Sequence, residues 1–457
     1  MGKRRKTEQR PLFVVTSEIV RSPGNAFYEQ LNAILDKNRF DQRIERLCAR
    51  YFPSQYGRPS MAPGVYFRML LIGYFEGLDS ERGIAWRTAD SLSLRDFLGF
   101  SLEEKTPDHS TVSRTRRLYW VETHKAVFRW VLKVLEKEGL VSGQSIAIDA
   151  TTLEANASMK NIVRRDGGES YDEYLKGLAK AAGIENPSKA ELARFDRKRK
   201  KKTSNQDWKS PVDKDARIAR MKDGSTHLAH KVEHAVDLSS GALVAITLQG
   251  ADQGDTTTIK KTLEQAQETA QMIDGLGVEE VVADKGYHSG EVLKGLHQQD
   301  VRSYIPEPDR GPRKWDGDGK AEEQKRVYAN RRRTRGERSK RLQKLRSELA
   351  ERSFAHMYET GGMRRVYLRG RQNILKRLLI QGAGFNLSIY IRNAFGVGKP
   401  RAMQGRMPNA TLIFGFISSL LRKIWRSSER FQLISSLTSP KRIFRSRRLG
   451  ILHLQTA

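Results

Sequence analysis

The chain has 457 residues with one cysteine, Cys48, and its 83 Lys and Arg against 53 Asp and Glu give a formal net charge of +30. The lone cysteine excludes an internal disulfide framework and a cysteine zinc cluster. The charge indicates a polyanionic partner, because Lys and Arg neutralise phosphates and release the counterions of those phosphates. Nucleic acid is the first candidate, and an anionic membrane is the second. The best membrane candidate, residues 411–421, is about half as long as a bilayer span, so we expect a cytoplasmic protein without a membrane.

Residues 1–140 carry helical patterns and form the first predicted domain. Apolar residues recur at helical spacing in 25–52, Pro63 begins a second helix and Ser80 starts a third. Further on, TPDHSTVSRTRRLYW offers Asp108 as an N-cap for a segment with three arginines. Such a segment either lays a short basic helix on DNA or forms a solvated turn, and the sequence favours neither. The arginines are Arg114, Arg116 and Arg117.

From residue 144 the pattern changes to strands that alternate with helices, which predicts an α/β fold. The predicted order is strand, strand, strand, helix, strand, helix and a last strand. The first strand is 144–149 and the fourth ends at Asp284. Two basic segments interrupt this pattern at about 157–222 and 306–345, and we expect phosphates to order both. A basic, loosely structured tail is predicted at 396–457.

Two of these strands run directly into an aspartate, in SIAIDATTLEANA at Asp149 and in EEVVADKGYHSGE at Asp284. Burying a carboxylate is costly unless it is paired or holds a cation, so two such acids predict a shared metal site. Carboxylate oxygens suit Mg²⁺, which takes its remaining ligands from water and a substrate phosphate. Two such ions can activate an attacking oxygen and stabilise a leaving one. The chain has no G-x-x-x-x-G-K-S/T loop, which argues against an NTPase.

A third acid is expected further along, in KLRSELAERSFAHMYETGGMRRVYLRGRQN. Glu348 and Glu351 are three residues apart and share a helical face. Glu351 is the better candidate because Phe354 and Ala355 offer apolar anchors for that face. The alternative is an intrahelical ion pair, the usual role of a glutamate in a basic helix. Three nearby arginines can hold phosphates bidentately. They are Arg352, Arg364 and Arg365.

The segments IAIDATTLEA, VVADKGYHS and ERSFAHMYETGGMRRVYLRG resemble, in this order, the three acidic motifs of bacterial insertion-sequence transposases of the DDE class. Two earlier segments, GRPSMAPGVYFRMLLIGYFEGLDSERGIAWR and PDHSTVSRTRR, resemble the helical region that precedes the catalytic domain in one large branch of them. The resemblance spans residues 25 to 395 approximately. It implies an RNase H-like fold at residues 141–395, which is a mixed sheet flanked by helices. In the chain this fold is preceded by an all-α domain that binds DNA ends. By position it implies a catalytic and metal-binding triad of Asp149, Asp284 and Glu351.

The resemblance also implies a reaction, the cutting and joining of double-stranded DNA at the terminal inverted repeats of an insertion sequence. It implies two divalent ions, Mg²⁺ with Mn²⁺ as the alternative. We expect the DNA partners to be the element ends and the target DNA. On DNA the protein is expected to be a homodimer or a larger oligomer. In the cell it is expected to be associated with the bacterial nucleoid. Two other functions stay open, an RNase H-like nuclease that cuts without joining and a catalytically inactive DNA-binding protein.

One feature departs from the family pattern. Many relatives carry a tyrosine, an arginine and a lysine at fixed offsets from the glutamate. Here Ser347 lies four residues before Glu351 and Tyr358 lies seven after it, so that pattern is not met. The candidates to substitute are Arg346, Arg352 and Lys376.

Three histidines, His227, His230 and His234, lie in one predicted strand, where the first points to the side opposite the other two. That arrangement suits a three-ligand zinc site poorly. We expect His230 and Lys231 to reach toward the DNA backbone instead. Accessory acids are Asp252, Asp255 and Glu154, although Asp255 is more simply a helix N-cap. The predicted DNA contacts are Arg114, Arg116, Arg117, His230, Lys231, Lys285, Arg352, Arg364, Arg365 and Lys376.

Overall fold

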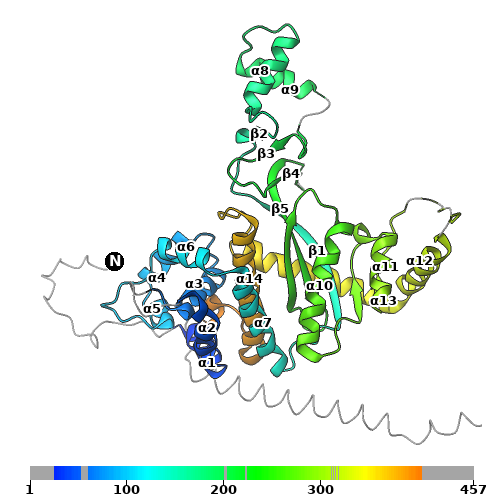
Figure 1. Ribbon diagram of the computed structural model, residues 1–457. Helices are drawn as coiled ribbons and strands as arrows, with labels where there is room; N and C mark the ends of the chain where they lie inside the picture. Colours follow the sequence, from blue (N-terminus) through cyan, green and yellow to red (C-terminus); the bar gives the residue numbers. More distant parts are fainter. Residues whose placement is uncertain are drawn as a thin grey trace, which may run out of the picture.

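The computed structural model describes residues 25–52, 60–199, 203–221, 224–309, 311, 313, 315–317 and 319–403. A helical region lies at one end of the molecule, a mixed sheet lies in the middle, and the helices α12 and α13 lie toward the other end (Figure 1). An arm that carries α8 and α9 projects from the sheet. Most of the predicted C-terminal tail, including residues 411–421, lies outside the described residues.

The first part of the chain forms helices, as the sequence predicts. Their starts follow local signals: Pro63 is at the first position of its helix, and Ser80 Oγ accepts a hydrogen bond from Gly83 N at 3.1 Å. Asp108 Oδ1 accepts one from Thr111 N at 2.7 Å. The helices are α1 (Ala26–Lys37), α2 (Phe40–Cys48), α3 (Pro63–Phe75), α4 (Glu81–Asp90), α5 (Leu92–Leu98), α6 (His109–Leu118) and α7 (Val121–Lys137).

The sheet has six strands, and its order β4–β5–β1–β7–β8 with β6 beside β5 confirms the predicted α/β class. β1 is antiparallel to β5 and parallel to β7, and β7 is parallel to β8. The first strand is longer than predicted, because it continues past Asp149 while paired with β5. The strands are β1 (Ser145–Glu154), β4 (Arg217–Arg220), β5 (Thr226–Asp237), β6 (Leu243–Gly250), β7 (Glu280–Val282) and β8 (Arg302–Tyr304).

Helices cover both faces of this sheet, and two neighbouring residues of β5 mark the two faces. Glu233 contacts α10 (Asp255–Asp274), and His234 contacts α13 (Glu337–Phe354). Successive side chains of a strand point to opposite sides, so α10 and α13 lie on opposite faces. α11 (Gly290–Gln298) and α12 (Lys320–Arg335) lie near the edge strand β8. This mixed sheet between helices is the RNase H-like arrangement.

A single long helix, α14 (Arg371–Phe395), joins the helical region to the sheet. It is buried along most of its length and packs against α3, α7 and β6. Gly384 allows close contact with α3, because a Cβ there would lie 2.7 Å from Tyr74 Cδ1. Gly382 does the same on the sheet side, where a Cβ would overlap Ile246. One continuous hydrophobic core therefore extends from the helical region into the sheet.

The two basic segments both contain folded elements. In the first, β2 (Val163–Arg164) pairs with β3 (Trp208–Lys209), and Trp208 packs in a small separate core with Ile162 and Leu228. α8 (Tyr171–Ala181) and α9 (Lys189–Lys198) complete that arm. The second segment contains α12. Among the helices of the described ranges, none combines the length and the apolar run that crossing a membrane requires.

Candidate active site

Asp149 and Asp284 follow paired positions of two neighbouring parallel strands, β1 and β7. β1 and β7 pair in parallel with Ala147 opposite Val282. Each aspartate follows its member of that pair by two residues, so the two carboxylates leave neighbouring strands at the same level. A shared site for the two acids requires neighbouring strands, and the register supplies that arrangement.

The carboxylate of Asp149 is held by two contacts. Its Oδ1 accepts a hydrogen bond from Ala150 N at 2.8 Å, and its Oδ2 accepts one from Arg346 Nη1 at 3.0 Å. Arg346 comes from α13, which is fastened to the same edge of the sheet by Gln343. The amide of Gln343 donates to Ala283 O at 3.1 Å and to Tyr304 O at 2.8 Å. α13 thus crosses the ends of β7 and β8 and places a cation on Asp149.

Asp284 begins the short 3-10 turn η4 (Lys285–Tyr287), and its Oδ1 accepts a hydrogen bond from Gly286 N at 2.8 Å. Gly286 keeps a narrow space open beside it. A Cβ at Gly286 would lie 2.8 Å from Asp255 Oδ2 and 3.0 Å from Asp284 Oδ1. Asp255 is the first residue of α10, whereas the N-cap is Gly254, so the predicted N-cap role of Asp255 is wrong. Its carboxylate instead faces the carboxylate of Asp284.

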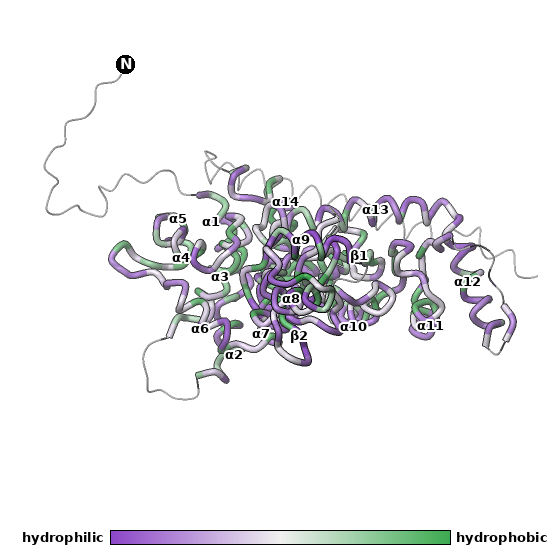
Figure 2. Tube along the Cα trace, turned by 90° about the horizontal axis from the view of Figure 1, so that it is seen from above, coloured by the Kyte–Doolittle hydropathy of each residue, from purple (hydrophilic) through white to green (hydrophobic). Residues whose placement is uncertain are grey.

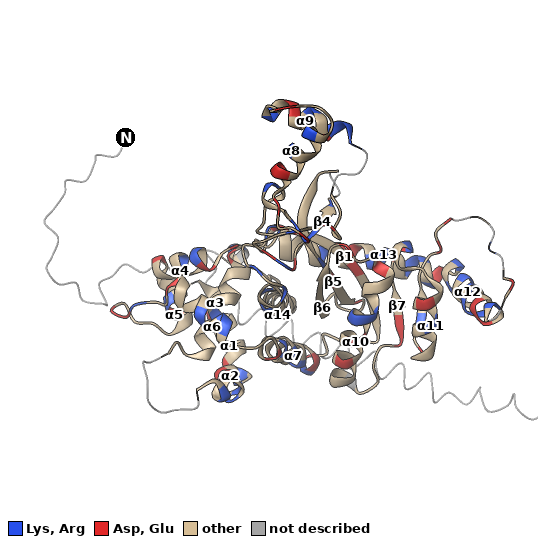
Figure 3. Ribbon diagram, turned by 45° about the horizontal axis from the view of Figure 1, so that its top comes forward, with Lys and Arg blue, Asp and Glu red and all other residues tan. Residues whose placement is uncertain are grey.

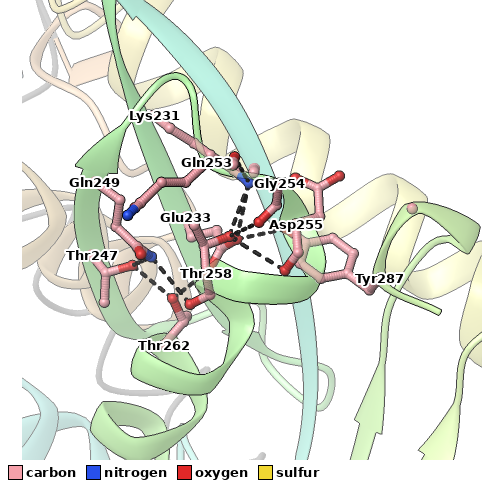
Figure 4. A network of polar contacts seen from close by, with 12 residues as sticks. Lys231, Glu233, Thr247, Gln249, Gln253, Gly254, Asp255, Thr258, Thr262 and Tyr287 are labelled. Atoms are coloured by element: carbon pink, nitrogen blue, oxygen red, sulfur yellow. Dashed lines mark hydrogen bonds and ion pairs between the residues drawn. The ribbon is translucent and has the colours of Figure 1, made fainter. Parts of the chain in front are cut away.

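A buried polar network lies behind these acids (Figure 4). Glu233 is fully buried, and its carboxylate accepts hydrogen bonds from Thr258, from Thr262 at 2.5 Å and from the hydroxyl of Tyr287 at 3.1 Å. Lys231 donates to Asp255, to Thr258 Oγ1 at 2.9 Å and to Gln253 O at 3.2 Å. Because Tyr287 belongs to the turn that Asp284 begins, the network ties this turn to β5, the neighbour of β1.

The electrostatics of Tyr287 and Glu233 reflect this packing. Burial, and after it the carboxylates of Glu233, Asp255 and Asp149, raise the pKa of Tyr287 far above its ordinary value. The hydroxyl therefore stays protonated and remains a hydrogen-bond donor to Glu233. Burial also raises the pKa of Glu233, while the hydrogen bonds from Thr258 and Thr262 oppose that rise.

The two glutamates considered for the third acid differ in their partners. Glu348 forms an ion pair with Arg352 four residues along α13. Glu351 is exposed, and its carboxylate makes no hydrogen bond or ion pair with any described residue. It lies five residues after Arg346, on a different side of the helix. The register gives Asp149 and Asp284 corresponding positions on neighbouring strands, and among the described residues no contact joins Glu351 to either of them.

The predicted DNA contacts divide into exposed and buried side chains. Arg114, Arg117 and Lys285 are exposed, and so are Arg352, Arg364 and Arg365 despite ion pairs with nearby glutamates. Four others are buried: Arg116, His230, Lys231 and Lys376. The structure contradicts direct DNA contact by these four.

Each of the four buried side chains has a partner inside the protein. Arg116 pairs with Glu81 at 2.6 Å, and Lys376 donates to the carbonyl oxygen of Arg116 at 3.0 Å. His230 Nε2 is 3.0 Å from the buried carboxylate of Asp213, and Lys231 belongs to the network of Figure 4. These four side chains are occupied by partners inside the protein and are not available to DNA.

The three histidines of β5 do not share a site. His227 lies 3.8 Å from Glu154, and His230 lies beside Asp213. His234 contacts Ser353 at 2.9 Å and Tyr358 at 2.7 Å on the α13 side. In the described ranges, no group of three or more His, Cys, Asp or Glu is arranged to hold a metal ion by itself. The three histidines therefore do not form a common zinc site, for which the sequence pattern is poorly suited.

The chemistry of the donor set nevertheless fits a divalent ion at the sheet edge. Asp149 and Asp284 supply carboxylate oxygens from neighbouring strands, and Gly286 leaves a space between Asp284 and Asp255 that any side chain would fill. Hard cations such as Mg²⁺ prefer these oxygens and complete their shell from water and substrate phosphates. The remaining ligands would therefore come from solvent and from DNA.

Several residues of this site were not identified from the sequence alone. Glu233 and Tyr287 were missed, and Arg346 was considered only as a substitute for a family residue. One signal exists for the first: in HKVEHAVD, the charged Lys231 and Glu233 flank Val232 in a central strand. Polar side chains at such positions need buried partners. The identity of those partners depends on helices far away in the sequence.

Comparison with known families agrees with this geometry. A family model described as "Transposase DDE domain" matches residues 144–386, and one described as "Transposase domain (DUF772)" matches residues 17–118. The first match covers the whole sheet and ends within α14, and the second covers most of the helical region. No curated protein matches the chain.

Proposed function

Because the chain belongs to the transposase DDE domain family, we propose that it cuts DNA at the terminal inverted repeats of its insertion sequence and joins the freed ends to target DNA. The observation that carries this proposal is the placement of Asp149 and Asp284 at the same level of two neighbouring parallel strands. Phosphoryl transfer of this kind needs positioned groups and charge neutralisation more than covalent chemistry. The family accounts for a transposase and a DNA substrate, and the joining step is our own proposal.

Members of this family generally depend on divalent metal ions. We propose that Asp149 and Asp284 hold two Mg²⁺, or Mn²⁺ in its place, with Glu351 as the third acid. Bound there, the ions would lower the pKa of an attacking water and neutralise charge on the scissile phosphate. Glu351 is preferred over Glu348 because Glu348 already has an ion-pair partner in Arg352, whereas Glu351 has none among the described residues.

The protein's own side chains contribute position and charge. Arg346 orients the carboxylate of Asp149, and Gln343 fixes α13 to the ends of β7 and β8. On the face of the sheet that α10 covers, Lys231 forms an ion pair with Asp255. Exposed arginines on α6, in the last turn of α13 and on the segment after α13 are proposed to bind the DNA backbone. They are Arg114, Arg117, Arg352, Arg364 and Arg365. Two element ends must meet, so we also propose at least a dimer on DNA.

The test is Asp149→Asn in a strand-transfer assay with Mg²⁺ and labelled terminal-repeat DNA. This change keeps the size of the side chain and its bond to Arg346 but removes the charge that a cation needs. We expect cleavage and joining to fall by at least about 10³-fold, with DNA binding retained. Asp172→Asn, an exposed carboxylate on α8, is the matched control and should leave activity unchanged.

Two outcomes would contradict the proposal. Undiminished strand transfer by Asp149→Asn would show that the carboxylate of Asp149 is not needed for catalysis. Cleavage by the wild-type protein without any joined product would show that the protein is a nuclease, which is one of the alternatives given in the sequence analysis.

A further inference from the structure

Five positively charged side chains on α12 and α13 are exposed and have no partner among the described residues. They make no hydrogen bond or ion pair with another described residue, and all lie within two consecutive helices around Gly336. We call them the α12–α13 basic face. They are Lys325, Arg332, Arg335, Arg341 and Lys344. Unpaired cations gathered on one surface repel each other and favour an anionic partner.

Other cations of the same helices have partners, which distinguishes them from the basic face. Arg333 donates to Ser303 O and to Ser303 Oγ, both at 2.9 Å, and Arg331 pairs with Glu307 at 2.5 Å. Arg338 pairs with the buried Glu280 at 2.7 Å. These contacts fasten α12 and α13 to the edge strand β8 and to β7. The basic face is therefore presented by a rigid support.

The basic face also has a hollow at one end. A cavity of about 430 Å³ lies between α11, α12 and β8, and its lining includes Lys325, Arg332 and Arg302. Lys325 and Arg332 are seven residues apart, two helical turns, and so point to the same side of α12. The stretch from Lys325 to Arg335 is about 15 Å long. Duplex DNA places roughly nine phosphate charges along that length.

The basic face and the candidate active site share one helix, α13. Lys344 is two residues before Arg346, so its side chain points to the other side of α13 from the guanidinium that contacts Asp149. α12 and α13 are hydrophilic along most of their length, and basic residues mark both helices (Figures 2 and 3). The helical region with α6 lies at the opposite end of the molecule, with the sheet between (Figures 1 and 2). DNA that passes the active site has therefore two separate places to bind.

We propose that the α12–α13 basic face binds the phosphate backbone of the target DNA, while the helical region binds the element end. This inference rests on the proposed function and adds to it the place of the second DNA. The face consists of Lys and Arg alone, which neutralise phosphates but do not by themselves select a sequence. Target binding through it is therefore expected to be independent of sequence and strongly dependent on salt.

The test uses two double variants of the full-length protein, Lys325→Gln/Arg332→Gln and Arg341→Gln/Lys344→Gln. The matched control is Lys260→Gln/Lys261→Gln, which removes the same charge from two exposed positions of α10. Each protein is first assembled on pre-cut terminal-repeat DNA that carries no flanking sequence. Fluorescence anisotropy then measures the binding of a labelled target duplex at several salt concentrations, and a gel shift measures binding of the repeat alone.

Each basic-face variant should bind the target duplex roughly ten-fold more weakly, and the slope of log affinity against log salt should fall by about 2. Binding of the repeat, and the melting temperature, should stay at wild-type values, as should every property of the α10 control. Unchanged target binding, or an equal loss of repeat binding, would overturn the proposal. If the wild-type protein neither binds nor joins terminal repeats, the proposed function itself fails, which is a different result.

Discussion

His234 of β5 shows how a single buried side chain depends on residues far away in the sequence. Its imidazole is fully buried against α13. Ser353 Oγ donates to the carbonyl oxygen of Ala350, so His234 Nδ1 donates to Ser353 and the Tyr358 hydroxyl donates to Nε2. In this arrangement the neutral imidazole has both ring nitrogens hydrogen-bonded, and burial lowers the pKa of His234 from 6.5 to about 3.

The protonation of His234 gives a prediction for stability against pH. The folded-state pKa lies below the unfolded value, so the contribution is complete above pH 6.5 and is lost as the pH falls toward 3. At pH 5 the loss should be about 2 kcal/mol relative to pH 7. We expect His234→Gln to show a smaller shift of the chemical denaturation midpoint between these pH values than the wild type.

The control for this experiment is His297→Gln, which changes an exposed histidine on α11. It should keep the wild-type dependence on pH. A His234→Gln protein with the same pH dependence as the wild type would contradict the assignment of a neutral, fully bonded imidazole.

At the scale of elements, α14 illustrates how two glycines allow a helix to lie between other layers. Glycine in the middle of a helix normally costs about 1 kcal/mol relative to alanine. Here Gly384 lets Tyr74 of α3 approach, and Gly382 lets Ile246 of β6 approach from the sheet side. The close packing on both sides explains why the helix is buried along most of its length.

This packing predicts opposite effects for two Gly→Ala changes. At Gly384 the added methyl would lie 2.7 Å from Tyr74 Cδ1, so Gly384→Ala should destabilise the protein by about 1–3 kcal/mol. At Gly295, in the middle of α11, a Cβ would meet no atom within 4 Å. Gly295→Ala should therefore stabilise by up to about 1 kcal/mol. Denaturation midpoints measure both, and a stabilised Gly384→Ala protein would show that α3 and α14 are not in close contact.

At the scale of the whole molecule, the helical region and the sheet share their core. The region that the sequence predicts as a separate domain, residues 1–140, packs its α3 and α7 against α14. The side chains of Tyr66 and Tyr74 on α3 are fully buried in this arrangement. The domain boundary in the sequence is therefore not a boundary in the hydrophobic core.

This shared core predicts that residues 1–140 do not fold by themselves. Without α14 they expose the apolar faces of α3 and α7, and so lose a large share of the burial that stabilises them. We expect the isolated fragment to lack a cooperative thermal transition by circular dichroism, and co-expression with residues 141–457 to restore one. A cooperative transition in the fragment alone would establish an independent domain.

The sequence by itself determined the order of the main elements of the sheet, β1, β5, β6, α10, β7, α11 and β8, but not the elements of the arm. The caps Ser80 and Asp108 and the start at Pro63 were predicted because such signals act within one helical turn. The family and the two aspartates could be identified because the motifs are contiguous, and the strand order was predicted to place Asp149 beside Asp284. Strand length was less predictable, since pairing with β5 extends β1 beyond Asp149.

Only the tertiary structure decided which polar side chains face solvent and which face each other. Arg116 resembles its exposed neighbours Arg114 and Arg117 in sequence, yet it is buried against Glu81 of another helix. Glu233 and Tyr287 are 54 residues apart and meet through the packing of η4 and α10 against β5. A local pattern fixes how a residue lies on its own helix or strand. Partners are fixed by register and by the rotation of packed helices, because these depend on contacts from the entire chain.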